Sequence, residues 1–397
     1  MGKLKIEGYE LRDVAVMQAP VSFCSHRCEV NPFINVCNRE VYPVFVSPMA
    51  SVTNEKNYKV WIDNKLTPVV PRSIQKSDEN PDGLSFEERM EIAKETFVSV
   101  SLGEAKNDLM KYLASQINLH NAVFYICIDI AHGTLSELYD VSKKIKYLYK
   151  QQIVLMAGNV ANTNAYSFYA DAGIDWMRVG IGGGSRCTSS ANVSIHYPMA
   201  TLLDGLNEER KAYAHSHNGN APTKIVADGG IGWFDDIQKS LALGADAVMC
   251  GKIFAECEEA CEEIYWARSL EEAKDETKRR YDTHNESNLP GNIQIDERGT
   301  NSLEELKLYM KPFIPFRDYY GMSTKKAQRK TGGSGTTTSE GIDRPVEVKH
   351  PVKKWVENME AYLRSCMTYT NSHTINELRE NAQVIILGGS GDAAYRK

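Results

Sequence analysis

Residues 122–157 read AVFYICIDIAHGTLSELYDVSKKIKYLYKQQIVLMA and predict one complete strand–helix–strand unit. The two ends, 122–130 and 153–157, are short apolar runs rich in Ile, Val and aromatic residues, which is typical of strands buried on both faces. Residues 136–150 between them have a helical pattern. Two strands joined through a helix lie parallel in one sheet, so this stretch indicates an α/β fold.

The same unit recurs along the chain. Apolar runs that predict strands lie at residues 43–47, 67–70, 96–102, 122–130, 153–157, 176–180, 224–227 and 245–249. Further helical patterns, at 163–172 and 234–243, end in the glycine-containing turns AGID and LGAD. Eight such units predict a closed (β/α)8 barrel. The alternative, a doubly wound sheet, requires a G-x-G-x-x-G turn after its first strand, and the sequence has none there.

We predict a single catalytic domain over residues 1–397. Its parts are the barrel at about 40–260, a divergent insertion at 255–318 with an acidic helical region at 256–278, a flap at about 319–345, and a tail at 346–397 with a helix at 352–366. The flap is predicted to be mobile because KKAQRKTGGSGTTTSEG, residues 325–341, is basic and then rich in Gly, Thr and Ser.

Composition excludes some classes of function. The chain has 46 basic and 52 acidic residues, a net charge of -6, which argues against broad binding to nucleic acid or anionic membranes. The most apolar stretch near the middle of the chain, 122–131, is short and contains Asp129. The first residues, MGKLKIEGYELRD, lack the apolar core of a signal peptide. Nine scattered Cys suggest free thiols, so we expect a cytoplasmic protein with neither nucleic acid nor membrane as partner.

Polar and glycine residues gather at the predicted carboxyl ends of the strands, where barrels of this kind carry their active sites. These residues are Ser47, Arg72, Asp129, Cys187, Asp228 and Gly251. The densest signal is VGIGGGSRCTS, residues 179–189, whose glycines allow close approach of the backbone to a ligand. Ser185 adds a hydroxyl suited to phosphate, and an amide-rich loop favours the thiolate of Cys187. A glycine turn beside a buried Cys is the alternative interpretation.

Two further segments follow the seventh and eighth strands, the usual phosphate-binding loops of such barrels. They are ADGGI at 227–231 and MCGK at 249–252. Amides at Gly230 and Gly251 could bind phosphate. The carboxylate of Asp228 suits hydrogen bonds from the hydroxyls of a ribose. The other interpretation is that Asp228 caps a helix.

Together these residues resemble the IMP dehydrogenase/GMP reductase family, whose usual loop reads G-I-G-P-G-S-x-C-T-T. The resemblance runs from about residue 8 to 380, is weaker over 255–318, and includes SPM at 47–49, YICID at 125–129, MAGNV at 156–160, YGMS at 320–323, SEG at 339–341 and RSCMTY at 364–369. It implies an oxidoreductase that acts on a purine nucleotide with a nicotinamide cofactor.

Within the family, the chain is more similar to GMP reductases. SEG followed by VEV at 346–348 matches their flap, and the Arg-Tyr pair with which IMP dehydrogenases activate water is missing between 325 and 345. SPM at 47–49, by contrast, is closer to the dehydrogenase form. We therefore predict an NADPH-dependent GMP reductase, with an IMP dehydrogenase that uses NAD, or an enzyme for a modified purine nucleotide, as alternatives. A catalytically silent barrel is disfavoured, because Cys187, Asp129 and Glu340 are all present.

The resemblance implies roles for individual residues. Cys187 would attack C2 of GMP and form a covalent thioimidate, while Ser189 or the adjacent Thr188, with Glu340, would protonate the leaving amine. The predicted substrate-binding residues are Met49, Ser185, Asp228, Gly229, Gly230, Gly251, Lys252, Gly321, Met322 and Ser323. The predicted cofactor-binding residues are Asp129, Arg72 and Lys325, and the carbonyls of Gly182, Gly184 and Cys187 match a potassium site. The family also implies a homotetramer.

The sequence departs from the family pattern at several of these positions. VPRS at 70–73 stands where GMP reductases carry a His-Lys-His cluster, which leaves Arg72 as the cation of that loop. Ser189 replaces the catalytic Thr, and Lys252 replaces a Gly or Ser of the phosphate loop. These changes bear on the substrate and on the direction of the reaction rather than on the family.

Overall fold

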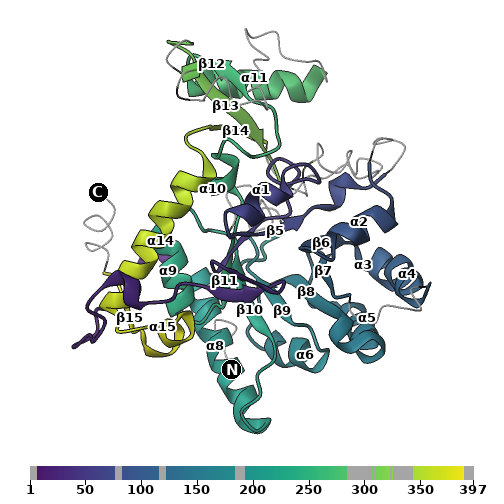
Figure 1. The fold of residues 1–397 in the computed structure, drawn as a ribbon, viewed down its shortest axis with the longest axis vertical. Coiled ribbons are helices and arrows are strands. Elements are labelled where there is room, and N and C mark those ends of the chain that lie inside the picture. The colour runs from purple at the N-terminus through teal and green to yellow at the C-terminus, as the bar shows by residue number, and fades with distance from the viewer. Residues whose placement is uncertain are drawn as a thin grey trace.

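The computed structural model describes residues 7–76, 83–115, 122–183, 193–283, 304, 306–307, 310–321, 324 and 343–388, with side chains left out at 280–283. Within these residues the predicted (β/α)8 barrel is confirmed: eight parallel strands close on themselves in the order β10-β11-β4-β5-β6-β7-β8-β9 (Figure 1). The strands are β4 (Val44–Val46), β5 (Thr67–Val70), β6 (Phe97–Val100), β7 (Phe124–Asp129), β8 (Ile153–Val160), β9 (Trp176–Val179), β10 (Lys224–Asp228) and β11 (Ala247–Cys250).

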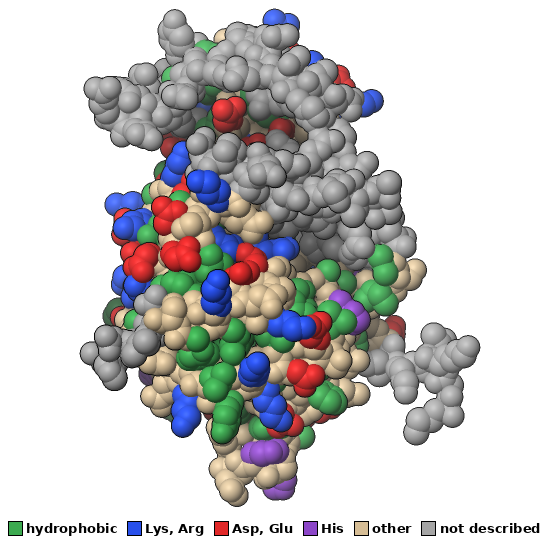
Figure 2. All heavy atoms as spheres, turned by 90° about the vertical axis from the view of Figure 1, so that its right-hand side faces the viewer, with side chains coloured by type: hydrophobic (Ala, Val, Ile, Leu, Met, Phe, Trp, Pro, Cys, Tyr) green, Lys and Arg blue, Asp and Glu red, His purple; other side chains and the backbone are tan. Residues whose placement is uncertain are grey.

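Helices cover the outside of the barrel. They are α1 (Tyr58–Asp63), α2 (Phe86–Ile92), α3 (Leu102–Glu104), α4 (Met110–Ser115), α5 (Ser136–Tyr149), α6 (Ala165–Asp171), α8 (Met199–Ser216), α9 (Phe234–Ala242) and α10 (Lys252–Ala255). The helices predicted at 136–150, 163–172 and 234–243 correspond to α5, α6 and α9, each within two residues at either end. Acidic and basic side chains are mixed over the face drawn in Figure 2.

The interior of the barrel is filled by large apolar side chains at the amino ends of its strands. Phe45, Phe97 and Trp176 pack edge to face, with ring centroids 5.8 and 5.2 Å apart for Phe45 with Phe97 and with Trp176. The hairpin β2 (Ile34–Val36) and β3 (Arg39–Val41) contributes Val36 and Val41 to this cluster. The amino end is therefore packed, and the predicted site residues Asp129, Asp228 and Gly251 lie at the other end.

The glycine turns before β9 and β11 set the register of the barrel. After each turn an Asp accepts the backbone N–H of the preceding strand: Leu155 donates to Asp175 at 2.7 Å, and Ile225 donates to Asp246 at 2.8 Å. Lys146 pairs with Asp175 at 2.8 Å, and Arg210 with Asp246 at 2.9 Å, so both carboxylates are neutralised. The predicted AGID and LGAD turns therefore end a helix and also bind the preceding strand through their Asp side chains.

The region after the barrel corrects one prediction. The expected helix at 256–278 is wrong in its first half, where the chain forms turns and then β12 (Tyr265–Ala267); α11 (Leu270–Thr283) follows. The three residues of β12 are buried and alternate between two apolar clusters, Tyr265 and Ala267 in one and Trp266 in the other. This alternation favours a strand, which pairs with β13 (Ile314–Tyr319), itself paired with β14 (Arg344–Glu347).

The remaining elements join the two termini. Helix α14 (Val352–Tyr369) extends the predicted helix at 352–366 and stacks Trp355 on Phe234 of α9 at 5.6 Å. After α15 (Ile375–Asn381), β15 (Val384–Ile386) pairs antiparallel with β1 (Val14–Val16).

No helix among the described residues is long and apolar enough to cross a membrane. The predicted extents of the domain, insertion, flap and tail stay predictions.

Candidate active site

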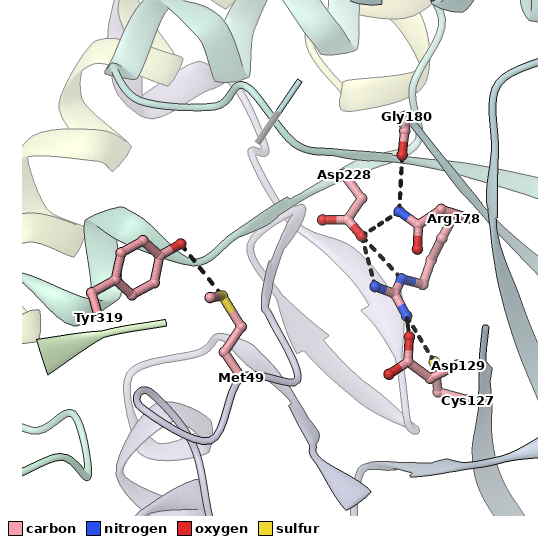
Figure 3. Close-up of polar contacts among 8 residues, drawn as sticks. Met49, Cys127, Asp129, Arg178, Gly180, Asp228 and Tyr319 are labelled. Atoms are coloured by element: carbon pink, nitrogen blue, oxygen red, sulfur yellow. Dashed lines mark hydrogen bonds and ion pairs between the residues drawn. The ribbon is translucent and has the colours of Figure 1, made fainter. Parts of the chain in front are cut away.

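A buried arginine organises the carboxyl end of the barrel. Arg178 of β9 is 5% exposed, and its Nη1 donates to Oδ1 of Asp129 at 2.7 Å (Figure 3). Its Nε and Nη2 donate to Oδ2 of Asp228 at 3.1 and 2.7 Å. One guanidinium therefore bridges carboxylates from the ends of β7 and β10, which lie two strands and one strand away from β9 in the barrel.

The two carboxylates of this bridge stabilise the charged form of Arg178. Burial alone lowers the pKa of Arg178, but the adjacent carboxylates of Asp228 and Asp129 outweigh burial, and the pKa lies well above its ordinary value. Burial raises the pKa of Cys127, whose Sγ is 3.5 Å from Nη1 of Arg178, to about 11. Cys127 is thus a neutral thiol at pH 7 and not a candidate nucleophile.

An amide extends the bridge to the backbone of the glycine-rich segment. Nδ2 of Asn159, on β8, donates to Oδ2 of Asp228 at 2.8 Å and to the carbonyl of Gly180 at 3.1 Å. Gly180 follows β9 directly and begins the segment that leads to Cys187. The bridge therefore fixes where that segment leaves the barrel.

Gly180 itself leaves no room for a side chain. Its φ is +121°, and an added Cβ would lie 2.4 Å from the carbonyl oxygen of Asp228. We expect Gly180→Ala to lower the free energy of unfolding by about 3 kcal/mol, the sum of backbone strain and overpacking. Gly219→Ala is the matched control, because Gly219 also has a positive φ, +81°, but nothing within 4 Å of its Cβ position. It should cost about 1 kcal/mol.

Urea denaturation of both variants measures the difference. Equal losses in the two variants would mean that the contact between Gly180 and Asp228 contributes nothing beyond backbone strain.

A second group of site residues lies at the end of β11. The hydroxyl of Tyr319, on β13, donates to Sδ of Met49 at 3.4 Å (Figure 3). A Cβ added to Gly251 would lie 2.6 Å from both of these side chains, so they close over the backbone of the predicted phosphate loop. Met49 and Gly251, predicted to bind the same substrate, are thus brought together.

Two basic residues predicted to bind ligands, Arg72 and Lys252, lie in the described part of the chain and have different surroundings. Arg72 starts the turn η3 (Arg72–Ile74), which Pro71 separates from β5, and its buried Nε has no hydrogen-bond partner among the described residues. Lys252 starts α10, with its Nζ 3.7 Å from Oε1 of Glu256 and its side chain 46% exposed. Of these two residues, Arg72 therefore has a buried N–H donor without a partner in the described part of the chain, whereas Lys252 lies near a carboxylate.

Several predicted site residues lie outside the described residues, so their roles stay predictions. They are Cys187, Thr188, Ser189, Ser185, Gly184, Met322, Ser323, Lys325 and Glu340. Gly182, Gly229, Gly230 and Gly321 are described. The described residues contain no group of three or more His, Cys, Asp or Glu side chains able to hold a metal ion, an observation that does not test a site built from carbonyls.

Sequence reasoning missed three residues of the site: Arg178, Asn159 and Tyr319. Arg178 carried a usable signal, because it is the one charged residue of the apolar run WMRVG and has to find a counter-charge when that strand is buried. Asn159 lies within the MAGNV motif at 156–160, which resembles the family. Tyr319 gave no local signal, since its partner Met49 is 270 residues away in the chain.

Comparison with known proteins gives the following similarities. The family model of the IMP dehydrogenase / GMP reductase domain matches residues 86–275 and 307–394. Inosine-5'-monophosphate dehydrogenases of the Staphylococcus aureus strains Mu50, USA300 and NCTC 8325 are each 31% identical to the chain over 299 residues. Each match covers 74% of this chain and 51% of the relative, so the chain spans about half the length of the curated relatives it matches.

Proposed function

The chain belongs to the IMP dehydrogenase/GMP reductase family, and from this we propose that it is a purine-nucleotide oxidoreductase, an NADPH-dependent GMP reductase that converts GMP to IMP and ammonia. The observation that carries the proposal is the bridge from Asp129 through Arg178 to Asp228. It fixes two carboxylates at the mouth of the barrel, beside the segment that leads to Cys187.

The described residues fit a nucleotide and a nicotinamide cofactor. Asp129 uses only Oδ1 in the bridge and Asp228 uses only Oδ2, so each has a second oxygen without a hydrogen bond within the described part of the chain. Both side chains are 14% exposed. They can accept from ribose hydroxyls, Asp228 from the nucleotide and Asp129 from the cofactor. The Nε of Arg72, which has no hydrogen-bond partner within the described part of the chain, suits an anionic group.

In the proposed reaction the thiolate of Cys187 attacks C2 of GMP. The C2–N bond breaks, ammonia leaves with a proton passed on by Ser189 or Thr188 and Glu340, and a thioimidate remains on Cys187. NADPH, when bound, supplies the hydride that C2 needs. The C2–S bond then breaks, which returns the Cys187 thiolate and releases IMP. Met49, Ser185, Gly229, Gly230, Gly251, Lys252, Gly321, Met322 and Ser323 are proposed to hold the nucleotide.

The other proposed properties depend on the same family membership. Lys325 in the basic flap would favour NADPH over NADH, and the carbonyls of Gly182, Gly184 and Cys187 would bind potassium. We also propose a cytoplasmic homotetramer.

IMP dehydrogenase is the second candidate, and the names of the relatives favour it. It would oxidise IMP with NAD and water to XMP through the same Cys187. The reaction then needs a base to activate water, for which Arg72 with Glu340 is the candidate pair. An enzyme for a modified purine nucleotide stays a third possibility.

Nicotinamide absorbance with the full chain and potassium tests the proposal. One cuvette holds GMP with NADPH, a second GMP with NADH, and a third IMP with NAD. Loss of NADPH with formation of IMP supports the reductase, and formation of NADH in the third cuvette supports the dehydrogenase instead. Absence of change in all three contradicts both and directs the search to other purine nucleotides.

A further inference from the structure

The amino-terminal residues lie against the segment that follows the glycine-rich loop. The backbone N–H of Tyr9 donates to Oγ1 of Thr201 at 2.7 Å, and the N–H of Thr201 donates to the carbonyl of Tyr9 at 3.2 Å. A Cβ added to Gly8 would lie 2.6 Å from Cγ of Pro198, so these two segments of the backbone are in close contact. Residues almost 200 positions apart in sequence are thus held together at this point.

His196 is the centre of this contact. Its Nε2 lies 2.8 Å from Oε1 of Glu10, and its Nδ1 lies 3.0 Å from the carbonyl oxygen of Ile181. Oε2 of Glu10 accepts the backbone N–H of Met199 at 3.1 Å, and the N–H of Glu10 donates to Asp13 at 2.8 Å. Both ring nitrogens of His196 therefore face oxygen atoms, one of a carboxylate and one of a backbone carbonyl.

One of these contacts, between Nδ1 of His196 and the carbonyl of Ile181, joins the two ends of the segment that contains Cys187, and Glu10 holds the other side of the His196 ring. Ile181 lies six residues before Cys187 and His196 nine residues after it, and the residues between Gly183 and Val193 are outside the described part. Joining the ends of a loop removes conformations that the loop would otherwise sample. A nucleophile within such a loop needs that restriction, because a displacement of about 1 Å can cost on the order of a hundredfold in rate.

We propose that Glu10 and His196 are positioning residues that hold the two ends of the Cys187 segment together. They act on the reaction through Cys187 and do not contact the substrate. The effect on turnover rests on the proposed function, whereas the effect on the reactivity of Cys187 does not.

The exposure of the pair separates positioning from folding. The side chains of His196 and Glu10 are 33% and 32% exposed, and exposed ion pairs contribute little to global stability. Loss of the pair should therefore leave Tm within about 2 °C of the parent. A structural role would lower Tm together with activity.

The kinetic test uses His196→Ala, Glu10→Ala and the double variant. We expect kcat to fall about tenfold in each single variant, with KM unchanged within about twofold, and no further loss in the double variant. His196→Gln keeps a donor near the position of Nε2 and His196→Asn one near Nδ1, so each should restore activity only in part. Glu137→Ala is the matched control, because it removes a 2.7 Å ion pair to Lys106 on the outer face and should not change kcat.

The second readout is the alkylation rate of Cys187 with iodoacetamide, followed by peptide mass spectrometry. The exposed Cys28 provides an internal reference within the same sample. We expect the Cys187 rate to change at least about threefold in His196→Ala and Glu10→Ala, but not in Glu137→Ala, while the Cys28 rate stays constant.

The proposal is overturned if both kcat and the Cys187 alkylation rate are unchanged, if the losses in the double variant add, or if Tm falls by more than about 5 °C. If the parent protein turns over neither nucleotide with either cofactor, the proposed function fails. The alkylation rates then decide the positioning role by themselves.

Discussion

Cys187→Ala is expected to abolish turnover, with a loss of at least about a thousandfold in kcat. The reason is that the proposed reaction needs the Cys187 thiolate to form the covalent bond to C2 that divides the reaction into two steps. The thiol of Cys127 contacts Arg178, and burial, which raises its pKa to about 11, keeps it protonated at pH 7. The measurement is nicotinamide absorbance under the conditions that give turnover with the parent protein.

Nucleotide binding provides the control for this variant. Removal of one sulfur should leave the Kd for GMP within about threefold in equilibrium dialysis, because binding depends on the groups that contact phosphate, ribose and base. Cys28→Ala should behave as the parent protein, since Cys28 is an exposed thiol. Turnover by Cys187→Ala at more than about a tenth of the parent rate would exclude the covalent route.

Arg178→Met is expected to have the second largest effect, with a loss of about 3–5 kcal/mol in the free energy of unfolding. Methionine fills a similar volume but leaves Asp129 and Asp228 without the cation they share. Both carboxylates are only 14% exposed, so water replaces the lost hydrogen bonds poorly. Activity should fall by more than about a hundredfold, because these carboxylates also serve the proposed ribose contacts. Urea denaturation and steady-state kinetics measure the two effects.

Two further variants distinguish charge from geometry at Arg178. Arg178→Lys keeps the charge but cannot make the three separate N–H contacts to two carboxylates, so it should recover stability only in part. Arg178→Met combined with Asp228→Asn should regain stability without activity, because one of the unpaired charges is gone. If Arg178→Met unfolds at the same urea concentration as the parent, the bridge is not a major source of stability.

The sequence alone predicted the barrel because its signals are local. Each strand is a short apolar run followed by a glycine turn or a helix, and the burial of eight such runs leaves a closed sheet as the simplest arrangement. The same local pattern located the polar ends of the strands, so Asp129, Asp228 and Gly251 could be identified before their partners were known. The family resemblance points to Met49, Ser189 and Glu340 and to the covalent role of Cys187, and these roles stay predictions.

Local pattern failed where a segment's partners lie far away in sequence. The acidic run at 256–263 suggested a helix that would continue through Tyr265–Ala267, but Tyr265 packs instead on Phe316 from β13, with ring centroids 6.4 Å apart. Burial on alternate faces requires a sheet on which to pack, and that sheet is supplied by residues about fifty positions later. Propensity was thus overridden by tertiary contact.

The sequence by itself determined which residues are buried, where strands end and which polar groups stand at the ends of strands, since these follow from hydrophobic spacing and turn residues. Only the tertiary structure decided which of those groups meet. Arg178 is 49 and 50 residues from its two carboxylates, and Glu10 is 186 residues from His196. The fold of the barrel brings such pairs together. The attraction between charges becomes specific only when the backbones that carry them are already held a few ångströms apart.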